Sequence, residues 1–216
     1  MKPAYKLLLA MAGLALLTVI GIGSWLFFYM GDLPDIDHLS QFAPNTQSSV
    51  VSDSCLASPS TSISFGGIGQ PLKDALAAAE PAKSLPHQIA RSLMCNHSGG
   101  MGKYHLSSMW LSWKIRMHFS EQQIFTIYVN RGYFGEGITG VERASEVFFH
   151  KEPNALSVAE AALIAGLLRA PDYFSPHKHP ERALTRRNKV LEEMLTQGML
   201  SAAEAAKLEA TPIAIQ

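Results

Sequence analysis

The chain has little of three things: net charge, strand-like patterning, and acidic residues in one stretch of its middle. Its basic and acidic side chains balance to a formal net charge of +0, so bulk electrostatics favour neither nucleic acid nor any other charged partner. After Gln70 there is hardly any alternation of the kind that marks strands, so we expect a mainly helical domain. Between Pro81 and Ser120 there is no Asp or Glu. The length of 216 residues allows one domain of ordinary size with additional segments.

A long apolar run stands near the N-terminus. Residues Leu7 to Met30 are uncharged and mostly apolar, and as a helix they would reach about 36 Å, enough for a hydrocarbon core of about 30 Å. Lys2 and Lys6 precede the run and acidic residues follow it, so the positive-inside bias keeps the N-terminus in the cytoplasm. A cleaved signal peptide is the alternative, but its apolar core should be shorter and end in small residues. The run therefore predicts a single-pass anchor.

Two cysteines are present, and both follow this run. With the topology above they lie in an oxidising compartment, where a disulfide between Cys55 and Cys95 is one outcome, although the sequence does not show that they meet. The alternative is a zinc site that uses Cys95, His97, His105 and Cys55. That spacing matches no standard ligand pattern, so we expect no metal site there.

The order of these signals divides the chain into four parts. We expect a cytoplasmic stub over 1–6, a transmembrane helix over 7–30, a juxtamembrane linker over 31–70 and the main domain over 71–216. Residues 44–69 are rich in Ser, Thr, Gly and Pro, which favours loop with a short strand at 49–52 and little buried core.

Three helix starts in the main domain share one pattern. A Ser is followed three residues later by Gln or Glu, which predicts a capping box at Ser120 with Gln123, Ser157 with Glu160, and Ser201 with Glu204. The first helix should run to about Val129. The second should span 159–169, because Pro171 disfavours helix in the residue before it.

Glycine and proline mark the remaining boundaries. Residues 131–140 hold four glycines, which predicts a tight loop before a helix that begins near Val141. A further helix should run from about Pro180 and end at Gly198, since glycine readily adopts the left-handed conformation after a helix.

The second half of the domain carries recognisable motifs. Residues 124–130 read IFTIYVN and resemble the ILExYLN motif, with Tyr128 and Asn130 kept and Thr126 in place of the glutamate. Residues 132–145, GYFGEGITGVERAS, resemble the glycine turn and helix that follow, and Arg186 and Arg187 begin a run similar to RRxxVL. These are motifs of the peptidoglycan glycosyltransferases of family 51, the glycan polymerases of bacterial cell-wall synthesis. The resemblance implies a lysozyme-like helical transglycosylase domain.

Upstream, the resemblance is thinner. Residues 72–80, LKDALAAAE, resemble the segment that carries the first motif, whose glutamate is the catalytic base, and Glu80 takes that position. Residues 83–94 can be laid on the second motif, STITQQLAKNLF, with Gln88 and Arg91 at its glutamine and lysine. Glu80 and Lys83 are then nearly adjacent, so the intervening stretch of the family's domain is deleted.

The third motif, RKxxE, carries the second glutamate of the family. If its spacing holds, Lys103 stands at the arginine and Ser107 at that glutamate. The window without acids contains no other carboxylate to replace it, so Glu121 or Glu136 would have to fold in from outside.

The resemblance implies a specific reaction. The hydroxyl of one lipid-linked disaccharide attacks the anomeric carbon of a growing strand and expels a lipid diphosphate. Such an inversion needs a carboxylate to take the proton, for which Glu80 is the candidate, and cations or a metal to receive the charge of the leaving group. The resemblance implies that substrate is bound by Gln88, Arg91, Lys103, Tyr128, Asn130, Arg186 and Arg187.

Each of these roles has a simpler alternative. Glu80 can be a surface residue at a helix end, and Tyr128 and Asn130 can be core and helix-end residues. Arg186 and Arg187 can lie on a solvated helix face, and His177 and His179 are expected to be exposed. The Arg and Lys side chains of the acid-free window suit binding of a diphosphate, because the Arg guanidinium can donate two parallel hydrogen bonds to phosphate oxygens and the Lys ammonium attracts them. They are equally consistent with a basic surface near an anionic bilayer.

Three functions compete. The first is an active monofunctional polymerase that joins lipid II disaccharides; it has no tightly bound cofactor and would use a divalent metal. The second, which the lost carboxylate and the deletion favour, is an impaired member that keeps binding of lipid II or of other cell-wall synthesis proteins. The third, a lysozyme-like hydrolase, rests only on fold analogy. All three predict a protein of the bacterial inner membrane with its domain on the periplasmic or outer side, and no nucleic-acid partner.

Overall fold

The computed structural model describes residues 2–30, 33–43, 62–94, 100–212 and 215. This part of the chain is helical and contains no strand, which confirms the expected mainly helical fold; a single bridge joins Tyr133 and Thr139. The elements are α1 Lys2–Met30, η1 Asp37–Phe42, η2 Phe65–Gly67, α2 Gln70–Ala79, η3 Ala82–Ser84, α3 Leu85–Leu93, α4 Met101–His118, α5 Glu121–Arg131, α6 Val141–Phe149, α7 Val158–Leu167, α8 Pro180–Thr196 and α9 Ala202–Glu209.

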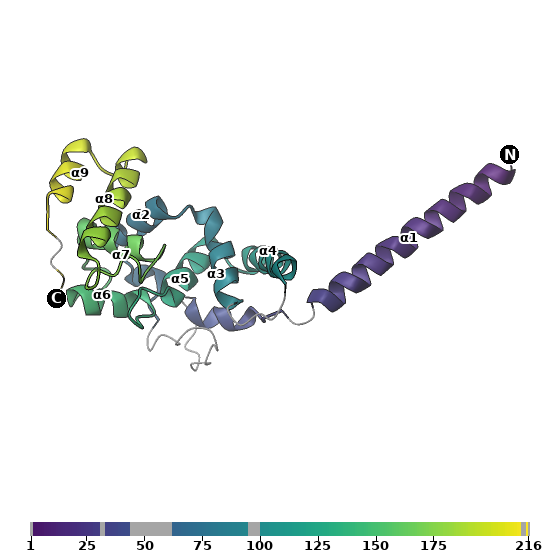
Figure 1. The fold of residues 1–216 in the computed structure, drawn as a ribbon, viewed down its shortest axis with the longest axis horizontal. Helices are drawn as coiled ribbons and strands as arrows, with labels where there is room; N and C mark the ends of the chain where they lie inside the picture. Colours follow the sequence, from purple (N-terminus) through teal and green to yellow (C-terminus); the bar gives the residue numbers. More distant parts are fainter. Residues whose placement is uncertain (1, 31–32, 44–61, 95–99, 213–214, 216) are drawn as a thin grey trace.

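The N-terminal run forms one helix, α1, which projects away from the helical domain (Figure 1). Within the described residues, however, no helix meets the length and apolarity needed to cross a membrane. The transmembrane helix expected over 7–30 is thus not confirmed.

The three predicted capping boxes are all present. The Ser120, Ser157 and Ser201 side chains each accept a hydrogen bond from the backbone N–H three residues later, and the side-chain oxygen at that position accepts one from the serine backbone N–H. These contacts fix where α5, α7 and α9 begin. The helix expected over 159–169 spans Val158–Leu167, and α8 ends at Thr196, two residues before the left-handed Gly198.

The core is organised around α7. Residues 161 to 167 of this helix are all buried, so it is apolar on every side, as a central helix must be. It packs against α2 and α8, while α3 packs against α4 and α5 (Figure 1). The C-terminal end of α2 therefore lies between the start of α3 and the end of α7. At this end Gln197 donates a hydrogen bond to the Ala78 carbonyl, 3.3 Å away.

The segment expected to be a linker contributes to the core, contrary to expectation. Ile36, Leu39 and Phe42 are buried around η1, which packs on α5, and Ile68 is buried just before α2. Two turns of 3-10 helix bring Ile36, Leu39 and Phe42, which are three residues apart, onto one surface. Three apolar residues at this spacing are too few to mark a helix in the sequence. The predicted strand at 49–52 and the pairing of Cys55 with Cys95 lie outside the described residues.

The glycine loop between α5 and α6 is tight, as predicted. Gly135 and Gly140 have φ of +90° and +87°, and a Cβ on Gly135 would stand 3.1 Å from the Pro171 carbonyl oxygen. Glu136 also adopts a positive φ, 56°, which costs energy for a residue with a side chain. The loop is thereby held against the segment that follows α7.

Candidate active site

Glu80 ends α2 and turns its carboxylate inward. The residue is extended, its N–H still donates to the Leu76 carbonyl, and Pro81 prevents the helix from continuing. Although a carboxylate is rarely buried, Glu80 is only 8% exposed. Its Oε2 accepts a hydrogen bond of 2.7 Å from Nε2 of Gln88 on α3, which satisfies part of this charge.

Gln88 is in turn oriented by Tyr128 of α5, whose hydroxyl donates to Oε1 of Gln88 at 3.1 Å. Burial, and secondly the negative charge of Glu80, raise the pKa of Tyr128 above its ordinary range, so the phenol stays protonated and remains a donor. Because Oε1 of Gln88 accepts this bond, Nε2 faces the carboxylate. Three helices thus hold one polar chain from Tyr128 through Gln88 to Glu80, and these three predicted site residues are brought together.

Arg169 completes the surroundings of Glu80, and sequence reasoning missed it. Its guanidinium Nη1 lies 3.8 Å from Oε1 of Glu80, and its side chain is 65% exposed, so it extends from the carboxylate toward solvent. The residue stands in the turn after α7. The only local signal was its position just before Ala170-Pro171, where the helix stops. Its proximity to Glu80 depends on the packing of α2 against α7, which no motif reveals.

Arg91 and Lys103 lie on the neighbouring pair α3 and α4. Arg91 is exposed, three residues after Gln88 on α3, so the two share a helix face. Its Nε donates to the hydroxyl of Tyr104, 3.3 Å away, and Lys103 precedes that tyrosine as a half-buried residue. Two predicted phosphate-binding cations therefore lie on the helix that carries Gln88 and on the helix packed against it.

Among the residues that the structure describes, no second carboxylate joins this group. Ser107, where the motif spacing puts the family's other glutamate, is fully buried, and its hydroxyl has no hydrogen-bond partner in the described part of the chain. Within those same residues the carboxylate of Glu80 makes a hydrogen bond or ion pair only with Gln88 and Arg169.

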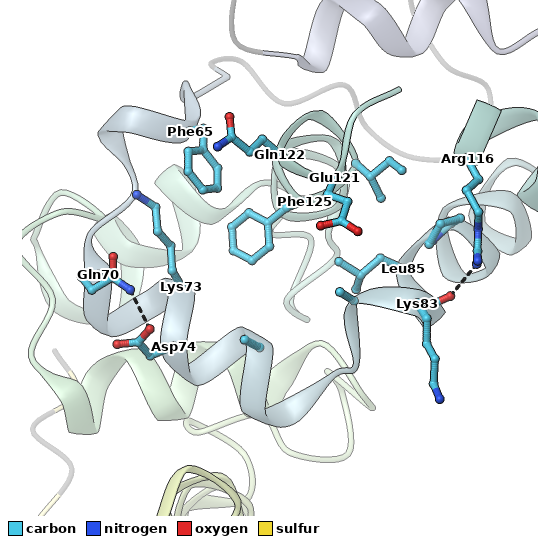
Figure 2. Close-up of a pocket in the computed structure, with 14 residues that line it drawn as sticks. Phe65, Gln70, Lys73, Asp74, Lys83, Leu85, Arg116, Glu121, Gln122 and Phe125 are labelled. Carbon is cyan, nitrogen blue, oxygen red and sulfur yellow. Dashed lines mark hydrogen bonds between the residues drawn. The ribbon is translucent and has the colours of Figure 1, made fainter. Parts of the chain in front are cut away.

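The two acids considered as replacements point elsewhere. Glu136 accepts a hydrogen bond from the Ser175 hydroxyl and lies 3.0 Å from Nδ1 of His177. The hydrogen bond from Ser175 is the main cause that lowers the pKa of Glu136. Glu121 instead lines a cavity of about 490 Å³ to which Glu80 does not contribute (Figure 2).

This cavity adjoins the short connection from α2 to α3. The Phe65 and Phe125 rings face it and meet edge to face at 5.7 Å, and Lys73 lies 4.2 Å above the Phe65 ring (Figure 2). At its other end Arg116 donates to the Lys83 carbonyl at 2.9 Å. A smaller cavity of about 250 Å³ is lined by both Gln88 and Tyr128 and so adjoins the polar chain to Glu80.

Asn130 lies outside the polar chain and uses its side chain within the protein. Its amide donates to the carbonyls of Phe42 and Ile63, at 3.1 and 2.9 Å, and its oxygen accepts from the Ile63 N–H at 3.1 Å. It thereby ties two N-terminal segments to α5. This pattern assigns Asn130 a structural role.

Arg186 and Arg187 are also buried rather than gathered at Glu80. Arg187 donates to the Thr211 and Glu209 carbonyls at 2.6 and 2.9 Å, which fastens the end of α9 to α8. Arg186 crosses α7: its Nε donates to the Gly166 carbonyl at 3.4 Å, and its Nη1 lies 3.7 Å from Glu193. A Cβ on Gly166 would stand 2.9 Å from Cγ of Arg186, so the glycine permits this crossing.

The donor set does not form a metal site. Among the described residues no three His, Cys, Asp or Glu side chains come together as ligands for an ion. One carboxylate with an arginine beside it does not by itself suit Mg²⁺, which takes several oxygen ligands.

Comparison with known proteins identifies the family. Residues 61–195 match the family profile described as transglycosylase. The chain belongs to the transglycosylase family. This match covers more than half of the chain and includes Glu80, Gln88, Tyr128 and Arg169. It confirms the resemblance to the family 51 enzymes of cell-wall synthesis.

Individual relatives agree with this assignment. Penicillin-binding protein 1A of Streptococcus pneumoniae is 39% identical over 104 residues, which are 48% of this chain and 14% of that protein. Penicillin-binding protein 1C of Escherichia coli is 37% identical over 130 residues, 60% of this chain and 17% of that protein. The crystal structure of penicillin-binding protein 1A from Haemophilus influenzae superposes on 72% of this chain and 18% of its own, with a TM-score of 0.51 and 25% identity. The chain thus spans less than a fifth of the length of each.

Proposed function

We propose that this transglycosylase-family protein polymerises glycan poorly and retains the binding of lipid II, or of a related lipid-linked diphosphate sugar, with association with other cell-wall synthesis proteins as its further role. The observation that carries the proposal is the single carboxylate of the site. Glu80 is held by Gln88 and Arg169, and the position aligned with the second acid is the buried Ser107.

The chemistry explains why one acid is a handicap. In the displacement the attacking sugar hydroxyl loses a proton as the bond from the anomeric carbon to the diphosphate oxygen breaks. Glu80 can accept that proton, but no second carboxylate assists it. Loss of a group that acts in the transition state commonly slows a reaction by about 10²–10⁴-fold.

The cations around Glu80 support retained binding. Arg169 is largely exposed beside the carboxylate, Arg91 lies three residues after Gln88 on α3, and Lys103 lies on α4, which packs against α3. Guanidinium groups bind phosphate oxygens in pairs and remain charged at any physiological pH. A diphosphate that approaches Glu80 would therefore meet positive charge on more than one side.

An active polymerase is the alternative function, and one observation favours it. The chain from Tyr128 through Gln88 orients the Glu80 carboxylate before substrate arrives, which is the preorganisation that a base requires. A rapid polymerase would then use Glu80 as its only base.

We further propose that α1 holds the protein at the bacterial inner membrane with the domain on the periplasmic or outer side. The large apolar side chains between Met11 and Ile22 are 55–68% exposed, which suits a helix that is surrounded by lipid. Sodium carbonate extraction of membranes tests this: the full chain should remain in the pellet, and its release into the supernatant would contradict anchoring.

The activity is tested with the purified full chain, fluorescent lipid II and a divalent metal. Polymerisation should be about 10²-fold or more slower than that of an intact family member at equal concentration. Fast strand formation that is lost in Glu80→Gln would reject the impaired function and establish the active one. Glu181→Gln, an exposed acid at the start of α8, is the matched control.

Binding is tested separately with the same protein and immobilised lipid II. The unmodified chain should bind, and the double variant Arg91→Ala, Lys103→Ala should bind about tenfold more weakly, because two phosphate contacts are removed. Arg143→Ala with Lys207→Ala removes two exposed cations elsewhere and should leave the affinity unchanged. If the unmodified chain does not bind, only association with partner proteins remains.

A further inference from the structure

The glycine loop between α5 and α6 packs against the turn that follows α7. A Cβ on Gly132 would stand 2.6 Å from Cδ2 of Leu168, and one on Gly135 would stand 3.1 Å from the Pro171 carbonyl oxygen. A side chain at either position would therefore push against the turn, since the interior of a protein is already close-packed. The two contacts lie on either side of Arg169 in the sequence, so the loop sets the path of the backbone that carries this arginine.

Side chains of the loop also hold the end of the turn. The Tyr133 hydroxyl donates to Oδ1 of Asp172 at 3.2 Å. The Glu136 carboxylate accepts a hydrogen bond from the Ser175 hydroxyl, and its Oε2 lies 3.0 Å from Nδ1 of His177. Ser175 is fully buried, so water competes little for this hydrogen bond. We call Glu136, Ser175 and His177 the Glu136 latch.

Glu136 adopts a conformation that only its surroundings can maintain. Its φ of 56° is unfavourable for a residue with a side chain, and such a backbone persists where the contacts around it impose it. The hydrogen bond from Ser175 is the main cause that holds the pKa of Glu136 below its ordinary value, so the carboxylate is ionised at neutral pH. Hydrogen bonds to an ionised acceptor are stronger than those between neutral groups. The latch is therefore suited to fix one geometry of the turn.

Arg169 depends on this turn for its direction. Its side chain is 65% exposed, and its Nη1 lies 3.8 Å from Oε1 of Glu80. An exposed ion pair is too weak to fix two side chains by itself. We propose that Glu136 is a positioning residue for Arg169: through the turn, the latch directs the guanidinium toward the Glu80 carboxylate.

This inference deepens the proposed function and rests on it for its purpose. A guanidinium that is already directed toward the site loses less conformational entropy when it meets the diphosphate of a lipid-linked sugar. The first test below contains no lipid-linked sugar. Its failure and the failure of lipid II binding are therefore separate results.

The first test observes Arg169 directly by NMR in the full chain labelled with ¹⁵N-arginine. Its Nε–Hε cross-peak is the one that Arg169→Lys removes, and Glu80→Gln should shift it because the charge beside the guanidinium is lost. In Glu136→Ala we expect the cross-peak to move toward its position in Glu80→Gln. Alanine keeps the unfavourable φ of the glutamate, so this variant removes only the contacts of the carboxylate.

Two variants serve as controls. Glu136→Gln keeps an oxygen that can accept from the Ser175 hydroxyl, so the Arg169 cross-peak should stay near its place in the parent. Glu146→Ala removes an exposed pair on α6, in which Oε1 of Glu146 lies 3.7 Å from Nδ1 of His150, and should leave the cross-peak unmoved.

The cross-peak separates positioning from stability alone. If Glu136→Ala lowers the unfolding midpoint but leaves the Arg169 cross-peak in place, Glu136 only stabilises the fold and the proposal is wrong. A cross-peak that is the same in the parent and in Glu80→Gln also overturns it, since Arg169 is then not directed at Glu80. Ser175→Ala removes only the hydroxyl of the latch and gives the same test if Glu136→Ala does not fold.

Lipid II binding then measures the coupling of the two residues. Glu136→Ala should weaken binding to immobilised lipid II by about threefold or more in the parent, and by less than about twofold when residue 169 is already alanine. Losses that simply add would show that Glu136 acts independently of Arg169 and would overturn the proposal. If the unmodified chain does not bind lipid II, the proposed binding fails, and the cross-peak alone decides whether Glu136 positions Arg169.

Discussion

Replacing Asn130 by alanine distinguishes a structural residue from a ligand-binding one. The motif implies substrate binding, whereas the structure shows three hydrogen bonds to the backbone of Phe42 and Ile63 and a residue that is only 1% exposed. We expect Asn130→Ala to destabilise the domain because it leaves two carbonyls and one N–H without their partner.

The size of the effect follows from the contacts. A hydrogen bond contributes about 1 kcal/mol net, and an unpaired buried group costs about 1–3 kcal/mol. The Phe42 carbonyl belongs to a buried residue, while Ile63 is half-buried and can recover part of the loss from water. We therefore expect the free energy of unfolding to fall by about 3 kcal/mol. At about 2–4 °C per kcal/mol this lowers Tm by about 6–12 °C.

Two measurements check this prediction. Urea unfolding of the full chain gives the free energy, and hydrogen exchange should show faster exchange at the Ile63 amide, whose acceptor is the Asn130 oxygen. Gln122→Ala, at an exposed position of the same helix, should change the free energy by no more than about 0.5 kcal/mol. If Asn130→Ala unfolds like the parent but binds lipid II much more weakly, the residue faces a ligand and the structural role is wrong.

Three further predictions concern buried charge. Arg187→Met removes donors to two carbonyls at the end of α9, so urea unfolding should show a loss of about 2–3 kcal/mol; an unchanged midpoint would contradict this role. For Glu160, burial raises the pKa, but hydrogen bonds from Lys151 and the α7 cap outweigh it, so the pKa lies below its ordinary value of 4.5. The stabilisation by Glu160 is therefore present above about pH 4.5 and lost as the pH falls through the folded pKa, and Glu160→Gln should flatten the acid side of the stability profile. Ser107→Glu should cost about 3–5 kcal/mol without raising polymerisation, because the new carboxylate would be buried and unpaired; faster polymerisation with an unchanged unfolding midpoint would refute this.

Local patterns in the sequence predicted local structure well. The three Ser caps gave the first residues of α5, α7 and α9, because a capping box involves only residues three apart and needs no other part of the fold. Pro171 and Gly198 likewise marked the helix ends to within two or three residues. The burial of Ile36 and Leu39 was missed, since η1 packs on α5, which is distant in the sequence, and a 3-10 helix of six residues repeats its spacing of three too few times to be recognised.

In the candidate site, too, the motifs predicted which residues take part but not how the fold arranges them. Glu80, Gln88 and Tyr128 could be named from motifs, yet the motifs did not show that the glutamine stands between the other two. Arg169 was missed because its neighbourhood is created by the packing of α2 on α7. The motifs also grouped Asn130 and Arg187 with the substrate, whereas both make backbone hydrogen bonds within the protein.

The packing of α4 bears on the missing second acid. Helix α4 aligns with the motif that should carry the second acid, but Ser107 faces the packed side, where an ionised carboxylate would have no partner. On the opposite side the helix exposes Met109, Trp110, Trp113 and Met117, and Lys103, Lys114 and Arg116 lie between the two faces. A carboxylate at residue 107 would have to ionise against the packed side of α4, where the Ser107 hydroxyl already has no hydrogen-bond partner among the described residues. This is why we do not expect Ser107→Glu to restore the second acid.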